Sequence, residues 1–351
     1  MKKHIIRLSL LAFSLGMLSC EDEATSNGDL NADIAKAELN ALASQASADV
    51  TRLTESEGVS GAIDLLYLLE DFDFSARKSY EEGVREQLHL IAQYFVYGPS
   101  SRVSNDEKPF SFDDIKGLYE WNSETESFDE SASDFFIVLF PTEGSITNNA
   151  ELKISSLDLV QITENIDGYI DEYQVPTDIE AYLKVDGELM VSLDFTAEWT
   201  ETGFPRKADV ELLVSPFTFV LGFDNTFPKS SSLVTSVQLD GEVIIGADVD
   251  VEFATERKEE PAILDGFVQY YNLKVSGNVD VPTAEEENSD LNDFINLELL
   301  LEGEKIGDII FENDEAYVLY SDGSRELLEE ILEPVLADIE DLINDFEEDF
   351  D

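Results

Sequence analysis

The sequence predicts an α+β protein: a large, twisted antiparallel sheet, laid out as a meander and either open or rolled into a half-barrel, covered by N-terminal helices and one C-terminal helix. Apolar and polar residues alternate with period two between residues 178 and 253, the pattern of strands with one dry and one wet face. Apolar residues recur at helical spacing within 31–97 and again within 324–351. Because the dry face of a sheet must be buried, we expect these helices to pack on it.

Two hairpins form the centre of this pattern. In each, alternating runs flank an Asp-Gly pair, at residues 186–187 and 240–241, which is a strong hairpin signal because both turn residues must adopt positive φ. Leu183–Phe195 and Val237–Val249 align around a shared Asp-Gly-Glu. Two copies are too few for a repeat architecture, so we interpret the likeness as convergence on one turn chemistry. After the second turn, Ile244 is expected on the wet face, and the expected dry-face residues are Val243, Ile245, Ala247, Val249, Val251 and Phe253.

The rest of the chain is expected to follow a simple order. It begins with a signal peptide (1–19) and an acidic tether (20–30), which are followed by a helical region (31–97) and a polar connector (98–109). The antiparallel sheet (110–323) comes next, and an amphipathic helix packed on the sheet (324–351) ends the order. Besides the central hairpins, a hairpin carrying Trp121 is expected over Gly117–Phe128. Further strands are expected at Phe135–Phe140, Leu152–Ile162, Ala208–Phe223, Tyr271–Val281, Leu297–Leu301, Ile306–Phe311 and Ala316–Tyr320.

The charge of the chain is strongly negative. Its 351 residues include 21 Lys and Arg against 78 Asp and Glu, a formal net charge of −57. Removing the leader takes away Lys2, Lys3 and Arg7, which leaves 18 − 78 = −60. A field of this sign repels nucleic acid and anionic lipid headgroups, so neither is an expected partner. It favours a medium rich in salt or divalent ions, in which the self-repulsion is screened.

The first twenty residues have the three parts of a secretory signal. A basic start precedes a short apolar core over Leu8–Gly16, and Met17-Leu18-Ser19-Cys20 follows. The core is too short to span a membrane. These residues resemble a bacterial lipoprotein leader with its lipobox, although Met17 and Leu18 are not the commonest residues at their positions. The resemblance implies cleavage before Cys20, acylation of that cysteine by fatty acids such as palmitate, and anchoring to a membrane through residues 20–30.

An acidic cluster, Glu21-Asp22-Glu23, follows the cysteine directly. It looks like the export signal of Gram-negative lipoproteins that are displayed on the outer face of the outer membrane. The resemblance therefore implies a lipid-anchored outer-membrane protein at the cell surface, with the periplasmic leaflet as the alternative. It ends at Glu23 and implies nothing about the folded part of the chain.

The residue types that several catalytic mechanisms need are scarce. The chain has one cysteine, Cys20, and two histidines, His4 and His89. It can form no internal disulfide and no Cys/His zinc set, and a Ser-His-Asp or Cys-His site is not expected. No phosphate-binding loop and no dinucleotide fingerprint is present, so no organic cofactor is expected.

Carboxylates are the one abundant class of reactive side chain. Asp248, Asp250 and Glu252 project from one face of a predicted strand and are the candidate ligands for weak divalent binding, with Ca²⁺ as the ion that would suit them. They do not follow the spacing of a dedicated calcium loop. A solvated acidic face is the alternative interpretation.

These observations favour a membrane-anchored, secreted acidic lipoprotein with a non-catalytic binding or structural role at the cell envelope. Its partner would be an envelope protein or a glycan. One alternative is a carrier that holds a lipid or another hydrophobic ligand between sheet and helices. A second alternative is a hydrolase that uses paired carboxylates, which 78 acidic residues do not exclude.

Overall fold

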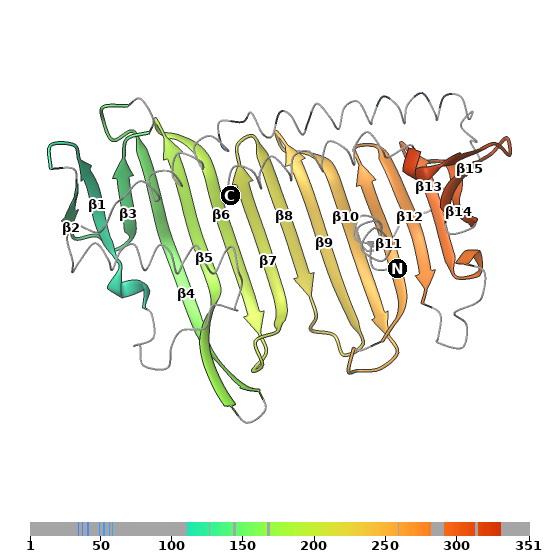
Figure 1. Ribbon diagram of the computed structural model, residues 1–351, viewed down its shortest axis with the longest axis horizontal. Coiled ribbons are helices and arrows are strands. Elements are labelled where there is room, and N and C mark those ends of the chain that lie inside the picture. The colour runs from blue at the N-terminus through green and yellow to red at the C-terminus, as the bar shows by residue number, and fades with distance from the viewer. Residues whose placement is uncertain are drawn as a thin grey trace. The chain divides into compact units, whose positions relative to one another are not determined.

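The structure is a computed structural model and describes most of the chain between residues 111 and 330. The described ranges are 111–125, 127–142, 145–166, 169–258, 260–281, 291–312 and 315–330. Seven single positions before them are also described: Ile34, Ala37, Ala41, Asp49, Arg52, Ser56 and Gly58. The predicted signal peptide, tether and connector lie outside the described residues. So do most of the predicted helical region and the C-terminal helix beyond residue 330. Within the described part there are sixteen strands and two short 3-10 helices, η3 (Phe112–Asp114) and η4 (Leu291–Asp293) (Figure 1).

The chain divides into two compact units. One comprises Ser56–Leu221, and the other comprises Met1–Glu55 together with Gly222–Asp351. We call them the 56–221 unit and the 222–351 unit. Strand β8 (Phe217–Asp224) begins in the first and ends in the second.

The strands of the 56–221 unit form a mixed sheet. From one edge, the hydrogen-bonded order is β2-β1-β3-β4-β5-β6-β7. Every neighbouring pair is antiparallel except β1 and β3, which are parallel. The strands are β1 (Gly117–Asn122), β2 (Ser127–Ser131), β3 (Phe136–Phe140), β4 (Ala150–Ile166), β5 (Tyr169–Val185), β6 (Glu188–Trp199) and β7 (Pro205–Val214).

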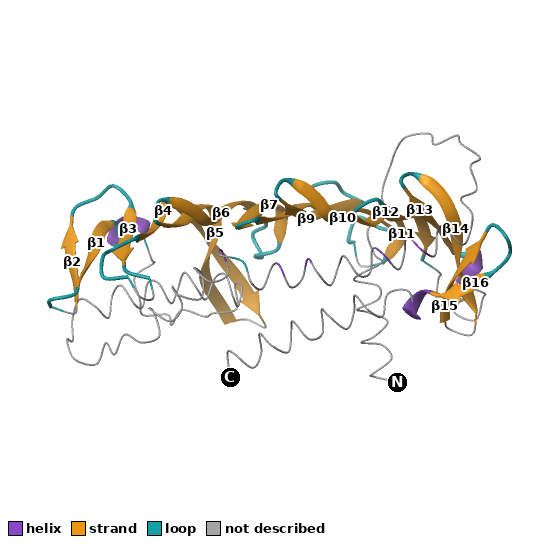
Figure 2. Ribbon diagram, turned by 90° about the horizontal axis from the view of Figure 1, so that it is seen from above, coloured by secondary structure: helices purple, strands orange, loops and turns teal. Residues whose placement is uncertain are grey.

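The strands of the 222–351 unit form an antiparallel meander in which each strand pairs with the next along the chain. Most of them lie in one layer (Figure 2). The antiparallel character that the alternation predicts is therefore confirmed. The strands are β9 (Ser230–Leu239), β10 (Glu242–Phe253), β11 (Pro261–Tyr270), β12 (Leu273–Asp280), β13 (Ile295–Leu301), β14 (Glu304–Glu312), β15 (Glu315–Tyr320) and β16 (Arg325–Leu327).

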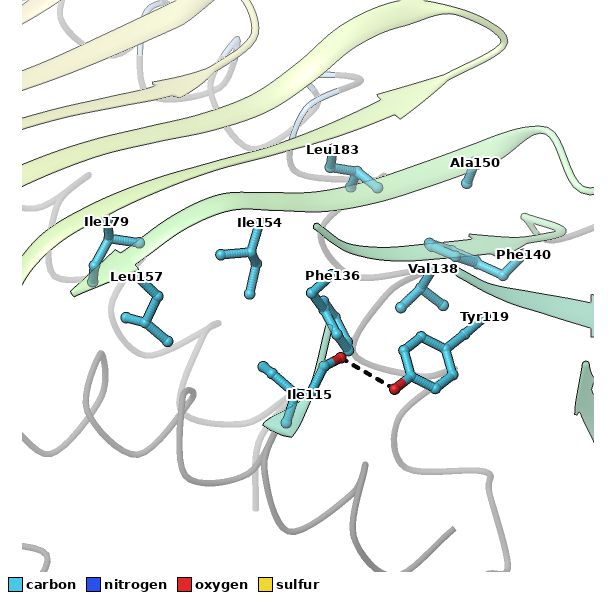
Figure 3. Close-up of a cluster of buried hydrophobic side chains, with 10 residues drawn as sticks. All are labelled: Ile115, Tyr119, Phe136, Val138, Phe140, Ala150, Ile154, Leu157, Ile179 and Leu183. Atoms are coloured by element: carbon cyan, nitrogen blue, oxygen red, sulfur yellow. Dashed lines mark hydrogen bonds between the residues drawn. The ribbon is translucent and has the colours of Figure 1, made fainter. Parts of the chain in front are cut away.

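Each unit has its own buried apolar cluster on one face of its sheet. In the 56–221 unit the cluster is formed by alternate residues of β3, β4 and β5 with Ile115 and Tyr119. The Tyr119 hydroxyl donates to the Ile115 carbonyl at 3.1 Å, which satisfies the one polar atom of that side chain (Figure 3). In the 222–351 unit a cluster contains Leu297, Leu299, Leu301, Ile306, Ile309, Val318, Tyr320 and Leu328.

The predicted α+β class is wrong. Of the described residues, 68% are in strands and 7% are helical, and in this part of the chain the sheet is not covered by several N-terminal helices. The physical reason is that period-two alternation continues almost without a break from 117 to 327, with turns of only a few residues at most connections. The parallel pairing of β1 with β3 also makes the sheet mixed, where a purely antiparallel one was predicted.

Two predicted boundaries also differ. Arg325–Leu327, expected to start the C-terminal helix, pairs with β15 as β16, and the helical residues begin at Leu328. The expected strand over residues 208–223 is two strands, β7 and β8, because the chain turns at Ser215-Pro216. Strand β11 was not among the predicted strands.

One hairpin design recurs three times. The turns Asp186-Gly187, Asp240-Gly241 and Glu302-Gly303 all have positive φ at both residues, from 52° to 54° at the acid and from 82° to 86° at the glycine. In each hairpin the register then shifts by one residue, at Met190, Ile244 and Ile306 respectively. A β-bulge at the same place therefore follows each turn. The copies lie on β5–β6, β9–β10 and β13–β14, so the sequence likeness of two hairpins extends to a third, Leu299–Phe311.

The bulge reverses the predicted facing of Val243 and buries Ile244, while Ile245 keeps the strand face of the buried Ala247 and Val249. Ile244, expected on the wet face, is 3% exposed, whereas Val243 and Ile245 are 39% and 40% exposed. Strict alternation assigns the wrong face here because the extra residue of a bulge shifts the pleat by one position. The Ile244 carbonyl accepts the backbone N–H of Tyr271 at 2.8 Å, so the bulge also holds the next turn of the sheet.

Candidate functional site

The polar face of the 222–351 unit brings acidic side chains together across strands. The registers place Asp250 on β10 directly opposite Asp265 on β11. Ser232 on β9 lies beside Asp250, and Asn278 on β12 lies beside Asp265. Directly opposed residues have Cβ atoms about 4.5–5.5 Å apart, so this row is a continuous line of hydrogen-bonding groups over four strands.

The next row contains a cation on an aromatic ring. Phe267 on β11 lies opposite Asp248 on β10, and the Lys274 ammonium nitrogen lies 3.8 Å from the centre of the Phe267 ring. Partial burial raises the pKa of Asp248, the Asp250 charge raises it further, and Lys274 opposes the rise. The same burial lowers the pKa of Lys274, which Asp248 partly offsets. Folding therefore removes part of the hydration of the Asp248 carboxylate and the Lys274 ammonium, which is unfavourable.

At Asp265 every cause shifts the pKa of the carboxyl in the same direction. Partial burial raises the pKa of its carboxyl, and the charges of Asp250 and Glu252 raise it further. The ionised form of Asp265 therefore destabilises the folded protein, and a cation placed beside it would relieve that effect.

Directly opposed acids recur across both sheets. In the 56–221 unit, Glu180, Asp194 and Glu211 form a row of three on β5, β6 and β7. Like charges at opposed positions destabilise a sheet, because the pairing of the strands keeps the two carboxylates close together and they repel each other. Other opposed pairs include Glu120 with Asp129, Asp158 with Asp178, Asp250 with Asp265, Glu298 with Asp308, and Glu312 with Glu315.

One of these pairs shows how a basic group relieves the repulsion. The Lys305 ammonium contacts Glu298 at 2.7 Å and Asp308 at 2.8 Å, so one cation bridges two opposed carboxylates. Burial alone would lower the pKa of Lys305, but its hydrogen bonds to Asp308 and Glu298 raise it above its ordinary value. The Arg325 guanidinium pairs in a similar way with Glu312.

The three candidate divalent ligands lie on one face, as alternate residues of β10. Asp250 and Glu252 are exposed and Asp248 is half-buried. Among the described residues, however, no group of three or more His, Cys, Asp or Glu side chains is placed to hold a metal ion. The structure instead pairs Asp250 with Asp265, which the sequence analysis missed. The missed signal is the half-buried run Pro261–Tyr270, which Gly266 interrupts.

A second set of contacts ties helical residues to the turns of the 222–351 unit. Asp49 accepts hydrogen bonds from the hydroxyls of Tyr270 and Tyr271, at 2.9 Å and 3.1 Å. Burial and the bond to Asp49 raise the pKa of Tyr270 well above its ordinary value. Three residues further on, Arg52 pairs with Asp240 of the β9–β10 turn at 2.8 Å. This part of the N-terminal segment is therefore fixed to one end of the strands.

The remaining sequence candidates are placed as follows. Cys20 and His89 lie outside the described residues. Trp199 is half-buried and donates from its indole nitrogen to the Pro176 carbonyl at 2.7 Å. Within the described ranges, no helix has the length and apolar character needed to cross a bilayer. Comparisons with models of protein families, with curated proteins and with solved structures yield no match.

Proposed function

We propose that this chain is a lipid-anchored protein of the cell envelope that binds a partner without catalysing a reaction. In each unit, taken by itself, the polar face of the sheet would be a binding surface, and a basic protein segment would be the partner. The observation that carries the proposal is the direct opposition of carboxylates, with Asp250 against Asp265 and with Asp194 between Glu180 and Glu211. These arrangements destabilise the free protein, and sequences break such a local rule chiefly where function requires it.

A basic partner fits this surface for a chemical reason. Lysine or arginine side chains presented at the spacing of a strand would each meet two carboxylates, as Lys305 meets Glu298 and Asp308 within the chain. Neighbouring strands lie about 4.8 Å apart, so a row of three opposed acids spans about 10 Å. Two basic residues at alternate positions of an extended segment are about 6.6–6.8 Å apart and can both lie over such a row. The net charge of the mature chain, 18 − 78 = −60, would also increase the rate of encounter with a basic molecule.

Anchoring would come from the N-terminus. The proposal takes Cys20 as the acylated residue and residues 20–30 as the tether. It places the protein in the outer membrane, at the cell surface because of Glu21-Asp22-Glu23. The test is the mass of the N-terminal peptide of the membrane-bound protein, with protease treatment of intact cells to locate it. A peptide that still carries residues before Cys20, or one whose Cys20 has a free thiol, would contradict the anchoring.

The binding is tested with a decalysine peptide by isothermal titration calorimetry. We expect the native chain to bind it, and the D194N and D265N variants to bind it more weakly, because each substitution removes an opposed charge. Glu256→Gln is the matched control, because it removes one exposed acid of the β10–β11 connection that has no opposed partner in the strand register. Equal losses for all three variants would indicate a general charge effect and would contradict a specific role for the opposed pairs.

A further inference from the structure

The hairpin of β4 and β5, in the 56–221 unit, extends beyond the strands on either side of it (Figure 1). Strand β3 pairs with β4 only as far as Ile154, and β6 pairs with β5 only from Asp178 onwards. The rest of the hairpin, residues 159–166 and 169–176, pairs only with itself among the described strands, and we call it the arm. The register shifts after Ile154 and again after Asp158, and the arm leaves the layer of the sheet beyond these bulges (Figure 2).

The β5 edge of the arm is closed by the connection between β6 and β7. The Trp199 indole nitrogen donates to the Pro176 carbonyl at 2.7 Å, and a proline has no N–H to offer to a further strand. Gly203 lies so close to the arm that a Cβ atom there would be 2.0 Å from the Tyr173 hydroxyl oxygen. One face of the arm is covered as well, since Val175 is 0% exposed. The arm is therefore supported by the rest of the protein, whereas an isolated two-stranded hairpin is only marginally stable in water.

The β4 edge of the arm differs from the edges that natural proteins protect with charges, prolines or bulges. Residues 159–163, Leu-Val-Gln-Ile-Thr, contain no proline and no charged residue, and they favour the extended conformation. Gln161 and Thr163 are exposed, and Val160 is 39% exposed. In an antiparallel pair, alternate residues direct their N–H and C=O groups away from the partner strand. This edge therefore directs main-chain donors and acceptors away from β5.

The charge around the arm selects the kind of strand that can pair with it. Residues 159–176 contain four acidic residues and no Lys or Arg, a net −4, and the opposed Asp158 and Asp178 at the base add −2. Residues 196–209, which include the β6–β7 connection, carry +2 − 3 = −1. Residues 112–116, which contribute to the apolar cluster that Leu159 contacts, carry +1 − 2 = −1. A second copy of the chain would bring the same acidic arm and would be repelled, whereas a basic segment would be attracted.

We infer that residues 159–166 of β4 take up an extended basic segment of another protein as an added strand. Main-chain hydrogen bonds to this edge provide the affinity, as in other cases of strand addition. Asp158 and Glu164 are six residues apart, so Lys or Arg residues at the same spacing in the added strand would lie opposite them, about 20 Å apart. The inference rests on the proposed function for the class of partner, and it adds a main-chain contact outside the rows of opposed acids.

The test measures the binding of the fluorescein-labelled peptide Lys-Val-Thr-Val-Thr-Val-Lys to the complete chain by fluorescence anisotropy. Two N-methylated versions of equal charge are the matched probes, one methylated at its valine nitrogens and the other at its threonine nitrogens. Because only alternate residues of an added strand donate to the edge, one version should bind at least about tenfold more weakly than the parent peptide, and the other about as tightly. No binding of the parent peptide, or equal affinities of the two versions, would overturn the inference.

Hydrogen exchange locates the bound peptide. Alternate amides of residues 159–166 should exchange at least about tenfold more slowly in the complex, because they become donors to the added strand. An unchanged exchange rate in this segment, with the peptide bound, would place the peptide elsewhere and overturn the inference. Slower exchange of the same amides in concentrated protein without peptide would indicate pairing with a second copy, and would overturn it as well.

Two variants matched in charge separate this inference from the proposed function. Asp158→Asn and Asp194→Asn each remove one acid from an opposed set, the first at the base of the arm and the second on the polar face. We expect D158N to bind the peptide about threefold more weakly and D194N to bind it as the native chain does. Equal losses would indicate a general attraction of charge and overturn the inference. If decalysine binding is insensitive to D194N and D265N while the peptide results hold, the polar-face proposal fails and the strand addition stands.

Discussion

Asp250 and Asp265 stand directly opposite each other on β10 and β11, on a polar face where the pKa of Asp265 is raised by burial, by Asp250 and by Glu252. A carboxyl whose pKa is raised on folding contributes stability that is present below its ordinary pKa and lost as the pH rises through the raised value. Asp265→Asn should therefore stabilise the protein at neutral pH, by about 0.5–1 kcal/mol.

The pH dependence tests the cause of that effect. The difference in melting temperature between D265N and the native chain should be greatest near pH 7. It should shrink as the pH falls towards the ordinary carboxyl pKa of 3.8, because the native Asp265 then becomes protonated too. A difference that stays constant over this range would show that the repulsion of Asp265 is not the reason.

Lys305 provides the opposite case. Replacing it with alanine removes the cation that contacts both Glu298 and Asp308, so we expect a loss of about 0.5–1 kcal/mol in the free energy of unfolding. In the double variant K305A/D308N, most of this loss should be recovered, since no opposed pair remains. Urea unfolding of the four proteins of the cycle measures the coupling, and additive effects would contradict the bridging role.

The bulge after the Asp240-Gly241 turn makes a clear prediction about packing. Ile244→Ala should destabilise the fold by about 2–4 kcal/mol, because it removes a buried side chain. Ile245→Ala, at the neighbouring position that is 40% exposed, should cost less than about 1 kcal/mol. Thermal or urea unfolding distinguishes the two, and a larger effect at Ile245 would mean that strict alternation is correct and that the bulge is absent.

Asp49 should matter more than Arg52, although both link the N-terminal segment to turns of the sheet. Asp49→Ala leaves the hydroxyls of Tyr270 and Tyr271 without their acceptor, and we expect a loss of about 1–2 kcal/mol. Arg52→Ala breaks an exposed ion pair with Asp240 and should cost less than about 1 kcal/mol. Asp49→Asn keeps an oxygen acceptor, so its loss in the free energy of unfolding should lie between those of Asp49→Ala and Arg52→Ala. If Asp49→Ala has no effect on the melting temperature, the carboxylate does not hold this segment.

The strands and turns could be predicted from the sequence where the signal is local. Alternation and the two Asp-Gly turns predicted β6, β9, β10 and the second half of β5, because both signals depend only on neighbouring residues. The first half of β5, from Tyr169, was not predicted. The one-residue bulge at Ile244 could not be predicted, since it depends on pairing with β9. Strand β11 was missed because Gly266 and half-burial on both faces weaken its alternation.

The candidate site was found only in part, for a related reason. Asp248, Asp250 and Glu252 share a strand, so their common face follows from local geometry. Their relation to Asp265 depends on the register between β10 and β11, and the connection between these strands carries no tight-turn signal that would fix it. The α+β class was predicted because the apolar stripes of the expected helices are as regular in the sequence as the alternation of the strands. The described part of the protein is mostly sheet.

The central claim is that opposed carboxylates on the polar face destabilise the free protein and are relieved by cations. The most direct measurement is the melting temperature of the native chain and of D194N over a range of NaCl concentrations, since Asp194 lies between two acids, Glu180 and Glu211. At low salt D194N should melt higher, by about 2–4 °C for each kcal/mol of repulsion removed. The two curves should converge as salt screens the charges of the native chain. Parallel curves, or a lower melting temperature for D194N throughout, would contradict the claim.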